Sequence, residues 1–113
     1  MKFLCLAYGD EEGWSSLSES EKHRALSQDA VIRDRGNIMS AVRTTVTSVT
    51  NWDGDLKVSD EPYAQHDLPL AGFSIIEAKD RNEVVRLVSD TPCARARGVI
   101  EIRAFWDVDD DSA

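Results

Sequence analysis

The segment from Asp60 to Leu70 holds the side chains best suited to chemistry in this sequence. Within eight positions it contains three carboxylates, a phenol and an imidazole: Asp60, Glu61, Asp67, Tyr63 and His66. A carboxylate beside an imidazole fixes the tautomer of the ring, and this is the arrangement of a general base. We therefore predict that His66, oriented by Asp60 or Asp67, moves a proton on a bound ligand. The alternative is an ordinary surface histidine, because neighbouring side chains in a loop often point apart.

Further candidate binding groups lie at the ends and on one face of predicted strands. Tyr8 and Asp10 follow an apolar run at the N-terminus, and a strand end beside a cleft commonly carries binding groups. Glu101 and Arg103 share one face of the last strand and are predicted to form an ion pair that lines a barrel. With Tyr63 these four complete the predicted ligand-binding residues. The alternatives are an acidic turn at Asp10 and an exposed ion pair worth less than about 1 kcal/mol.

The second histidine, His23, lies near the start of a predicted helix. Helical spacing would bring Glu19 or Ser27 alongside it. The alternative is a solvent-exposed helix residue.

Several classes of site have no signature in the sequence. The chain has no glycine-rich phosphate loop, no nucleophile elbow and no paired histidine or cysteine spacing typical of metal sites. Its two cysteines, Cys5 and Cys93, lie far apart, and Cys5 belongs to an apolar run. We predict no metal and no cofactor, although a metal held by distant carboxylates and histidines stays open.

The overall charge restricts the partners of the chain. The formal net charge is −8 over 113 residues, and the basic residues are scattered. Binding to nucleic acid or to an anionic membrane requires clustered Lys and Arg, so neither partner is predicted. No run approaches the ~20 apolar residues of a membrane span, and the N-terminal apolar run is too short for a signal peptide. A cytoplasmic protein is expected.

Hydrophobic patterning divides the first half of the chain into three elements. Residues 2–8 are almost continuously apolar and predict a buried strand, followed by an acidic loop over residues 9–14. A helix is predicted to begin after Ser18 with a capping box, to run to about Arg35 and to end at Gly36. Its narrow apolar face is predicted around one set of residues: Leu26 and Ala30, flanked by Ala25, Val31 and Ile32. Residues 38–51 are rich in Val and Thr and predict a strand.

The second half begins with the strongest hairpin signal in the chain. Asp53-Gly54 predicts a tight turn that pairs residues 55–59 back in antiparallel fashion. After the loop from Asp60, a strand is predicted over residues 73–78. A second capping box then starts a helix on Asp80 and Glu83, whose apolar face comprises Val84, Val85, Leu87 and Val88 and which ends at Thr91-Pro92. A last strand covers residues 99–106, and residues 107–113 form an acidic tail.

These elements predict a single domain over residues 1–106 of the α+β class. Two helices separated by a hairpin pack on one face of an antiparallel sheet in the ferredoxin-like arrangement. The other face would expose a contiguous apolar patch that is unusual on a free monomer. Its expected contributors are Leu4 or Phe3, Ile75 or Ile76, and Phe105, beside Ser74, Glu101 and Arg103. We therefore predict a homodimer through this face, with the polar members inside the resulting α/β barrel.

Three short motifs, in order and at consistent spacing, resemble the YCII-related family, whose signature is Asp-Gly-Pro-Phe. They are Tyr8-Gly9-Asp10-Glu11-Glu12 with Trp14, Asp53-Gly54 with Val58-Ser59-Asp60-Glu61-Pro62-Tyr63-Ala64, and Ala71-Gly72-Phe73-Ser74-Ile75-Ile76. The resemblance covers roughly residues 2–106. Glu61 stands where the signature has Gly and Tyr63 where it has Phe. Gln65, Asp67 and Leu68 replace a Glu, Lys and Glu that are common further on.

The resemblance implies a dimeric α/β barrel of ferredoxin-like protomers. Most members of the family have no assigned function, although one relative is a dehydrochlorinase of chlorinated aromatic breakdown products and some members are linked to sigma-factor regulators. Two functions are therefore expected. One is a small enzyme that performs acid–base, lyase-like chemistry on a small organic molecule in the dimer barrel. The alternative is a non-catalytic module that binds a small ligand or regulates another protein.

Overall fold

The structure is a computed structural model and describes residues 1–106. The acidic tail predicted for residues 107–113 lies outside the described residues. The elements of the described part follow in this order: β1 (Lys2–Tyr8), α1 (Glu11–Ser15), α2 (Glu19–Asp34), β2 (Ile38–Ala41), β3 (Ser48–Trp52), β4 (Asp55–Ser59), β5 (Leu70–Glu77), α3 (Arg81–Val88), α4 (Pro92–Arg95) and β6 (Val99–Ala104).

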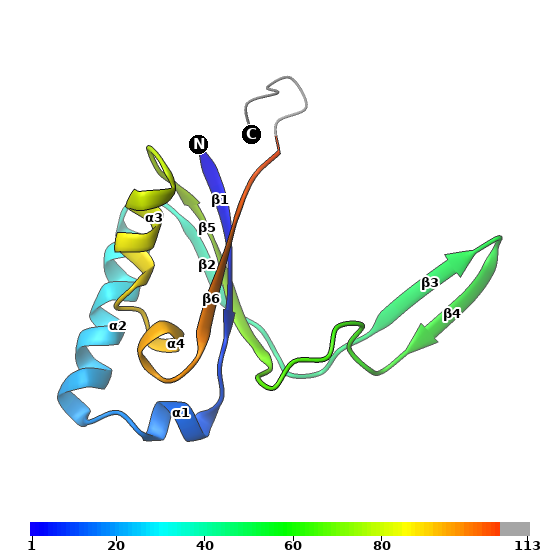
Figure 1. Cartoon of the computed structure of the whole chain (residues 1–113), viewed down its shortest axis with the longest axis horizontal. Helices are drawn as coiled ribbons and strands as arrows, with labels where there is room; N and C mark the ends of the chain where they lie inside the picture. The colour runs from blue at the N-terminus through cyan, green and yellow to red at the C-terminus, as the bar shows by residue number, and fades with distance from the viewer. Residues whose placement is uncertain (107–113) are drawn as a thin grey trace.

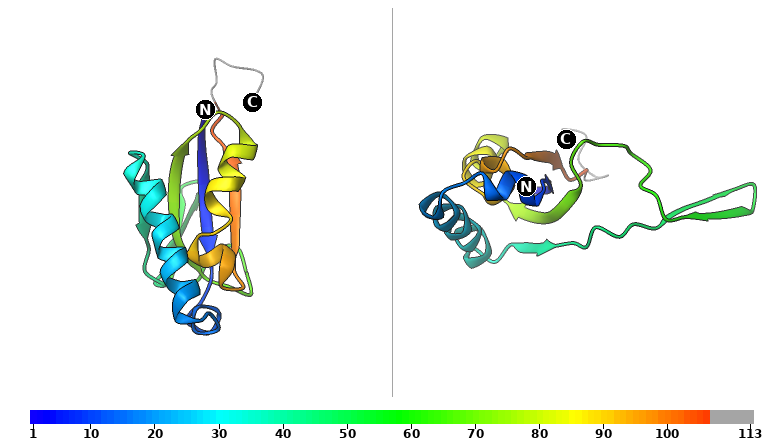
Figure 2. Two further views of the ribbon diagram at one scale, coloured as in Figure 1. Left: turned by 90° about the vertical axis from the view of Figure 1, so that its left-hand side faces the viewer. Right: turned by 90° about the horizontal axis from the view of Figure 1, so that it is seen from below.

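Four of the strands form an antiparallel sheet in the order β2-β5-β1-β6. The helices all lie on one face of this sheet, which leaves the other face open (Figure 1, Figure 2). Because the sheet strands alternate with helices as strand, helix, strand, strand, helix, strand, this is the predicted ferredoxin-like α+β fold. The hairpin β3–β4 forms a separate two-stranded sheet.

The register of β1 decides which side chains enter the core. Successive residues of a strand point to opposite faces of the sheet. Phe3 and Cys5 are buried beneath the helices, whereas Leu4 pairs with Ile75 and Arg103 on the open face. This assigns the pairs left undecided by the sequence, since Leu4 and Ile75 are the open-face members. The prediction that Ser74 lies on the open face was wrong.

Ser74 is opposite Cys5 in the register and is buried on the helix side. Ser74 directly precedes Ile75 in β5, so the two side chains point to opposite faces of the sheet. Since Ile75 is on the open face, Ser74 is on the core face.

The helices complete a core whose fully buried side chains include Ile32, Ile76 and Val84. On α3 the buried residues are Val84, Leu87 and Val88, as predicted, but Val85 is exposed. On α2 the centre of the predicted apolar face was wrong, since 53% of Leu26 is exposed to solvent. The predicted flanking residues Ala25 and Ile32 are the buried ones. The sequence has two overlapping apolar stripes on α2, one with Leu26 and one with Ala25 and Ile32. The helix packs the stripe with Ala25 and Ile32 against the sheet.

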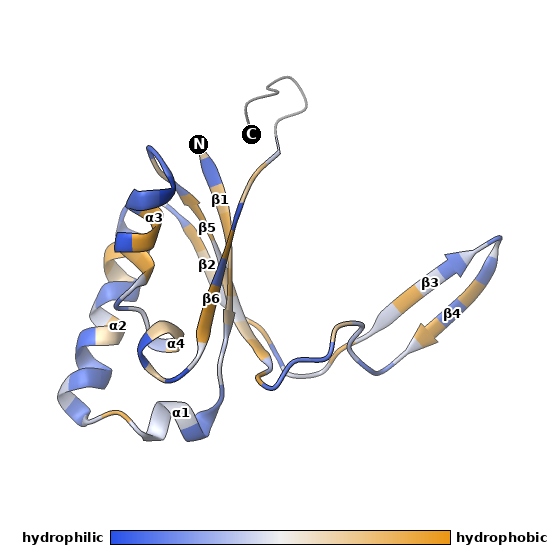
Figure 3. Ribbon diagram, viewed as in Figure 1, coloured by the Kyte–Doolittle hydropathy of each residue, from blue (hydrophilic) through white to orange (hydrophobic). Residues whose placement is uncertain are grey.

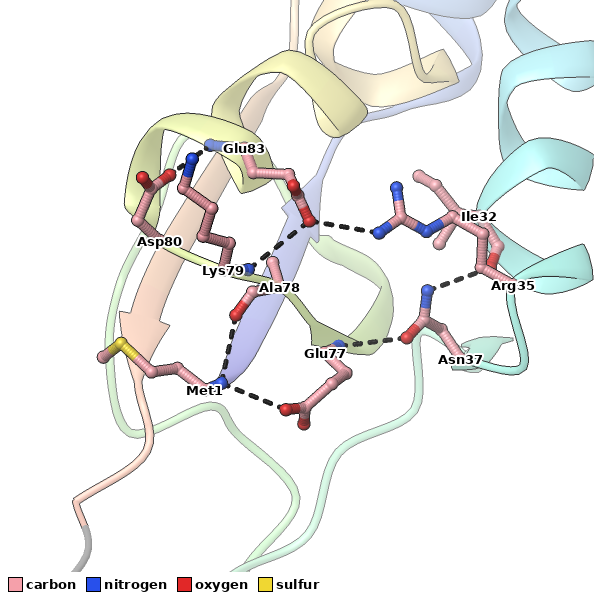
Figure 4. Close-up of polar contacts among 9 residues, drawn as sticks. All are labelled: Met1, Ile32, Arg35, Asn37, Glu77, Ala78, Lys79, Asp80 and Glu83. Carbon is pink, nitrogen blue, oxygen red and sulfur yellow. Dashed lines mark hydrogen bonds and ion pairs between the residues drawn. The ribbon is translucent and has the colours of Figure 1, made fainter.

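Hydrogen bonds at the helix starts confirm the first capping box and modify the second. Ser18 and Glu21 exchange both bonds expected of a capping box. Asp80 accepts a bond from the Glu83 amide at 2.9 Å, but the Glu83 carboxylate accepts from the Lys79 amide and from Arg35 instead. Figure 4 shows this exchange, which joins the start of α3 to the end of α2.

Asn37 performs a similar role at the same end of the sheet. Its amide donates to the carbonyl of Ile32 at 3.0 Å, and its side-chain oxygen accepts from the Glu77 amide at 3.0 Å (Figure 4). The N-terminal ammonium of Met1 also binds the Glu77 carboxylate at 3.0 Å. This polar network holds α2, β5 and the N-terminus together.

Two short helices, α1 and α4, were not predicted from the sequence. Residues 9–14 were predicted as a loop, but α1 begins after Asp10, whose carboxylate accepts a bond from the Gly13 amide at 2.8 Å. Acidic residues in the first turn of a helix are favourable because of the helix dipole. Thr91-Pro92 was predicted to end a helix, and α3 does end just before it, at Val88. Pro92 also begins α4, since proline fits the first helical position.

The hairpin forms an arm that extends away from the body of the domain on the side of the open sheet face (Figure 1, Figure 2). Asp53 and Gly54 both have positive φ, at 55° and 77°, which is the two-residue turn that their sequence predicts. The prediction of one strand over residues 38–51 was wrong, because the chain leaves the main sheet after β2. Val and Thr favour extended backbone without specifying the partner strand.

Within the described residues, none of the helices combines the length and the apolar character needed to cross a bilayer.

Candidate functional site

A bulge in the main sheet positions Tyr8 at the end of β1. Ala7 pairs with Gly72 whereas Tyr8 pairs with Leu70, so Ala71 is an extra residue in β5. Bulges of this kind often lie at sheet rims beside functional sites, where they re-aim a side chain. On the other side, a side chain at Gly98 would overlap the carbonyl oxygen of Tyr8. A glycine at that position therefore allows the start of β6 to approach the end of β1.

A cavity of about 710 Å³ opens beside Tyr8, which we call the loop pocket. Its walls are the two chain segments that lead to and from the arm, over residues 42–46 and 60–70. Four of the predicted site residues from the loop line this pocket together with Tyr8: Asp60, Tyr63, His66 and Asp67. The structure thus brings the predicted catalytic residues and two of the predicted ligand-binding residues around one cavity.

Tyr8 and His66 contact one another within the loop pocket. Their ring centroids are 4.9 Å apart and their planes are inclined by 55°. Among the described residues, neither Asp60 nor Asp67 makes a hydrogen bond or ion pair to the imidazole. The structure therefore places the phenol, and not a carboxylate, beside His66.

The remaining predicted residues lie apart from this pair. Asp10 caps α1 and lines a neighbouring cavity. Glu101 and Arg103 form an ion pair with the guanidinium Nε 2.8 Å from the carboxylate Oε1. This hydrogen bond and the Glu101 charge raise the pKa of Arg103, with a smaller contribution from Tyr8. The pair belongs to the open face of the sheet and is at least 41% exposed at each side chain.

His23 lies on the exposed side of α2. Its backbone carbonyl accepts a bond from the Ser27 hydroxyl at 2.9 Å.

A second, smaller cavity of about 230 Å³ lies between the sheet and the helices, and sequence reasoning missed it. Its lining is mainly apolar, and it includes the carboxylate residue Asp29 of α2. Burial raises the pKa of Asp29, an effect that the nearby Arg33 partly offsets. No hydrogen bond or ion pair joins the Asp29 side chain to another described residue. A carboxylate without a partner in an apolar cavity favours a ligand that donates hydrogen bonds or carries positive charge.

The spacing on α2 carried a signal for this cavity. Ala25, Asp29 and Ile32 are at positions i, i+4 and i+7, which share one face of a helix. Because Ala25 and Ile32 are buried, a charge between them lies against the interior.

A third cavity joins the other two. It has a volume of about 470 Å³ and is lined by Asp10, Glu11 and Trp14 among others. It shares Thr44 and Pro69 with the loop pocket, and it shares Ala71, Pro92 and Cys93 with the cavity beside Asp29. The bulged residue Ala71 therefore stands between the third cavity and the one beside Asp29.

The model of one protein family, the YCII-related domain, matches residues 1–109 of the sequence. The chain belongs to the YCII-related family. No match is found among curated proteins. A solved structure similar to this chain is 5-chloro-2-hydroxyhydroquinone dehydrochlorinase (TftG) from Burkholderia phenoliruptrix AC1100, in complex with 2,5-dihydroxybenzoquinone. The two proteins are 13% identical, the match covers 94% of each chain, and the TM-score is 0.48.

Both thiols of this YCII-related domain line the interior cavity. Burial raises the pKa of Cys5, and it raises the pKa of Cys93 together with the negative charge of Asp29. A raised pKa keeps a thiol protonated at neutral pH, and the protonated form is a poor nucleophile. The cysteines of this YCII-related domain therefore belong to the wall of the cavity and not to its chemistry.

No group of three or more His, Cys, Asp or Glu side chains in residues 1–106 of this YCII-related domain is arranged to hold a metal ion.

Proposed function

We propose that this YCII-related domain binds a small organic molecule in the loop pocket and that His66 transfers a proton on it. The observation that supports this proposal is the contact between Tyr8 and His66 in the wall of a cavity of about 710 Å³. An imidazole is the side chain best suited to proton transfer near neutral pH. A phenol beside it can donate or accept a hydrogen bond to the same ligand.

The charges around the cavities indicate the class of ligand. The loop pocket is lined by Asp60 and Asp67, with Arg43 as a basic residue in its wall. The adjoining cavity adds Asp10 and Glu11. A cleft lined predominantly by one sign of charge attracts the opposite sign and repels its own. The ligand is therefore a neutral or cationic molecule, and its apolar part fits the largely apolar walls.

A lyase-like elimination is the reaction that these groups could perform. His66 takes a proton from a carbon of the ligand, the electrons of that C–H bond form a double bond, and the leaving group departs from the neighbouring carbon with its bonding electrons. The protonated imidazole then returns its proton to the leaving group or to water. Tyr8 would hold the ligand by its hydroxyl during this step.

A non-catalytic binding module is the second candidate, and one specific observation favours it. No carboxylate of the described residues is hydrogen-bonded to His66, so nothing in the free protein fixes its tautomer. A general base is usually oriented by such a partner. In this second function the same pocket would bind its ligand without turnover.

We also propose a homodimer through the open face of the main sheet. Leu4, Leu6, Phe73 and Ile75 occupy this face by the register of β1 and β5. Such a face is rarely left uncovered on a soluble monomer. A second copy would cover it and would place Glu101 and Arg103 inside the interface.

The two histidines allow a matched experiment. The chain contains only His23 and His66, and His23 is on the exposed side of α2 away from the pocket. Native mass spectrometry of the purified protein would first identify a copurified ligand or, failing that, hits from a screen of neutral and cationic aromatic compounds. Binding and turnover of that compound are then measured for His66→Ala and for His23→Ala.

We expect His66→Ala to weaken binding at least about tenfold and to abolish any turnover, while His23→Ala leaves both unchanged. Loss of turnover with binding retained supports proton transfer by His66. Loss of binding in a protein without turnover supports the second function. Equal behaviour of the two variants in both assays contradicts a role for His66.

A further inference from the structure

The β3–β4 arm has one apolar face that is largely exposed in the described part of the chain, residues 1–106. Val49 pairs directly with Val58, and Asn51 pairs with Leu56, so these four side chains share a face. The exposed fractions of Val49, Leu56 and Val58 are 61%, 63% and 62%. Figure 3 shows the apolar segments on both strands of the arm, well away from the body. The opposite face carries Thr50 in register with Lys57 and Trp52 in register with Asp55.

An arm of this kind has little to hold it together alone. An isolated two-stranded hairpin is at best marginally stable in water, and it normally needs packing against a third element. The alternation of Leu56 and Val58 with polar residues in β4 is that of a strand with one buried face. The apolar residues of the arm are therefore those of a strand that packs on another surface, and the part of the chain that the structure describes leaves them exposed.

A second unpartnered face lies on the same side of the molecule. The arm projects from the side of the main sheet that the helices leave open (Figure 1). That open face carries Leu4 and Leu6 from β1 and Phe73 and Ile75 from β5. Because the arm borders the region in front of the open face, one partner molecule can contact both the arm and the sheet (Figure 1).

The charges of both faces suit a second copy of the chain. The charged side chains on the open face are Lys2, Glu77, Glu101 and Arg103. Lys2 is in register with Glu77, and Arg103 is paired with Glu101, so the face has no net charge. The apolar face of the arm carries no charge either. In a chain of net charge −8 these are surfaces on which two copies can meet without strong repulsion.

The sizes of the faces also agree with a dimer. Strand spacings of about 4.8 Å and rises of about 3.4 Å per residue give the open sheet a projected area of about 400 Å² and the arm face about 160 Å². A stable interface buries about 800 Å² of accessible surface on each partner. The arm face alone is too small for this, whereas both faces together approach it.

We propose that the apolar face of the β3–β4 arm packs on a second copy of this chain, continuous with the interface between the two open sheet faces. Each protomer then contributes a sheet face and an arm face to one two-fold symmetric contact. This inference rests on the proposed homodimer and extends it. The partner chemistry that fits is an uncharged, apolar β-surface.

The arm also connects the interface to the loop pocket. Residues 42–46 and 60–69 run between the arm and the main sheet, and they form the walls of that pocket. Ser48 at the base of β3 donates a hydrogen bond to the Glu61 carbonyl at 2.6 Å, which ties the two segments together. When the partner holds the arm, both walls are fixed. The pocket with Tyr8 and His66 is therefore complete only in the dimer.

The first test compares two substitutions on opposite faces of the arm. Leu56→Asp introduces a charge on the apolar face, and Thr50→Asp introduces the same charge on the other face, opposite Lys57. Sedimentation equilibrium would measure the dimer dissociation constant, and circular dichroism would check that both variants are folded. We expect Leu56→Asp to weaken dimerisation at least about tenfold, because a leucine loses its buried environment, and Thr50→Asp to change it less than about threefold.

The second test needs no substitution. A mixed dimer of ¹³C-labelled and unlabelled wild-type chains is examined for intermolecular NOEs. The proposal requires such NOEs from the methyl groups of Val49, Leu56 or Val58. If they arise from Leu4 and Ile75 but not from these arm methyls, the arm inference is wrong and the dimer through the sheets stands. A monomer at all concentrations overturns both.

Discussion

The ring centroids of Tyr8 and His66 lie 4.9 Å apart, although Tyr8 ends the first strand of the main sheet and His66 lies in the loop that follows the arm. An inclination of 55° between the planes agrees with the tilted arrangements that aromatic rings prefer. The register shift at Ala71 lies where Tyr8 pairs with Leu70, at the point where this loop enters the sheet. The only imidazole in the pocket thus meets the sheet at a break in the regular pairing of β1 with β5.

Replacing Tyr8 tests the contact between the two rings directly. Tyr8→Leu removes the ring, and we expect the ring-proton shifts of His66 to move towards random-coil values and the protein to lose about 0.5–1.5 kcal/mol of stability. Tyr8→Phe keeps the ring and removes only the hydroxyl, so both quantities should stay near those of the wild type. The measurements are ¹H–¹³C correlation spectra and urea unfolding. Unchanged His66 shifts in Tyr8→Leu would show that the rings do not meet in solution.

The two apolar stripes of α2 give a second prediction. Ile32 is fully buried, whereas 53% of Leu26 is exposed. Ile32→Ala should cost about 2–5 kcal/mol of unfolding free energy because it leaves a cavity in the core. Leu26→Ala should change stability by no more than about 0.5 kcal/mol. Chemical denaturation measures both, and a larger loss for Leu26→Ala would mean that α2 packs with its other stripe.

A third prediction concerns Asp29 and pH. Because burial raises its pKa above the usual 3.8, the folded chain holds this proton more tightly than the unfolded chain. Below pH 3.8 the carboxyl group is protonated in both states and costs nothing. As the pH rises, the unfolded chain ionises first, so the folded state loses stability relative to it.

Asp29→Asn removes this cost. The variant should be more stable than the wild type at pH 7, by less than about 1 kcal/mol because the carboxylate is only partly buried. The difference should shrink as the pH falls towards 3.8. Urea unfolding at several pH values measures it, with Asp67→Asn as an exposed control from the loop. A pH-independent difference between wild type and Asp29→Asn would exclude this explanation.

Most of the ferredoxin-like body could be predicted from local signals. The apolar run of β1, the capping box of Ser18 with Glu21 and the turn at Asp53-Gly54 each determine structure within a few residues. The side of β5 on which Ser74 lies could not be predicted, because a strand that is apolar on both faces gives no alternation to read. The register with β1 decides it.

The candidate site was predictable in composition but not in geometry. The density of polar groups in residues 60–67 directed attention to a segment that lines the loop pocket. That the ring of Tyr8 contacts His66 depends on how the loop returns to the sheet, and this has no marker in the sequence. Asp29 was overlooked for a related reason. Its position on the buried side of α2 follows only once the phase of that helix against the sheet is known.

The arm and the body of this chain assemble on different timescales. The hairpin closes through a two-residue turn whose strands are neighbours in sequence, and such hairpins form in about 1–10 μs. The central strand β1 must instead wait for β6 at the far end of the described chain, and contacts between distant parts of a chain form slowly. During synthesis, Val49, Leu56 and Val58 therefore become available as a strand surface before the sheet that completes the domain exists. Early exposure of this kind invites pairing between nascent chains, and Lys57 together with Asp53 and Asp55 at the turn supplies the charges that oppose it.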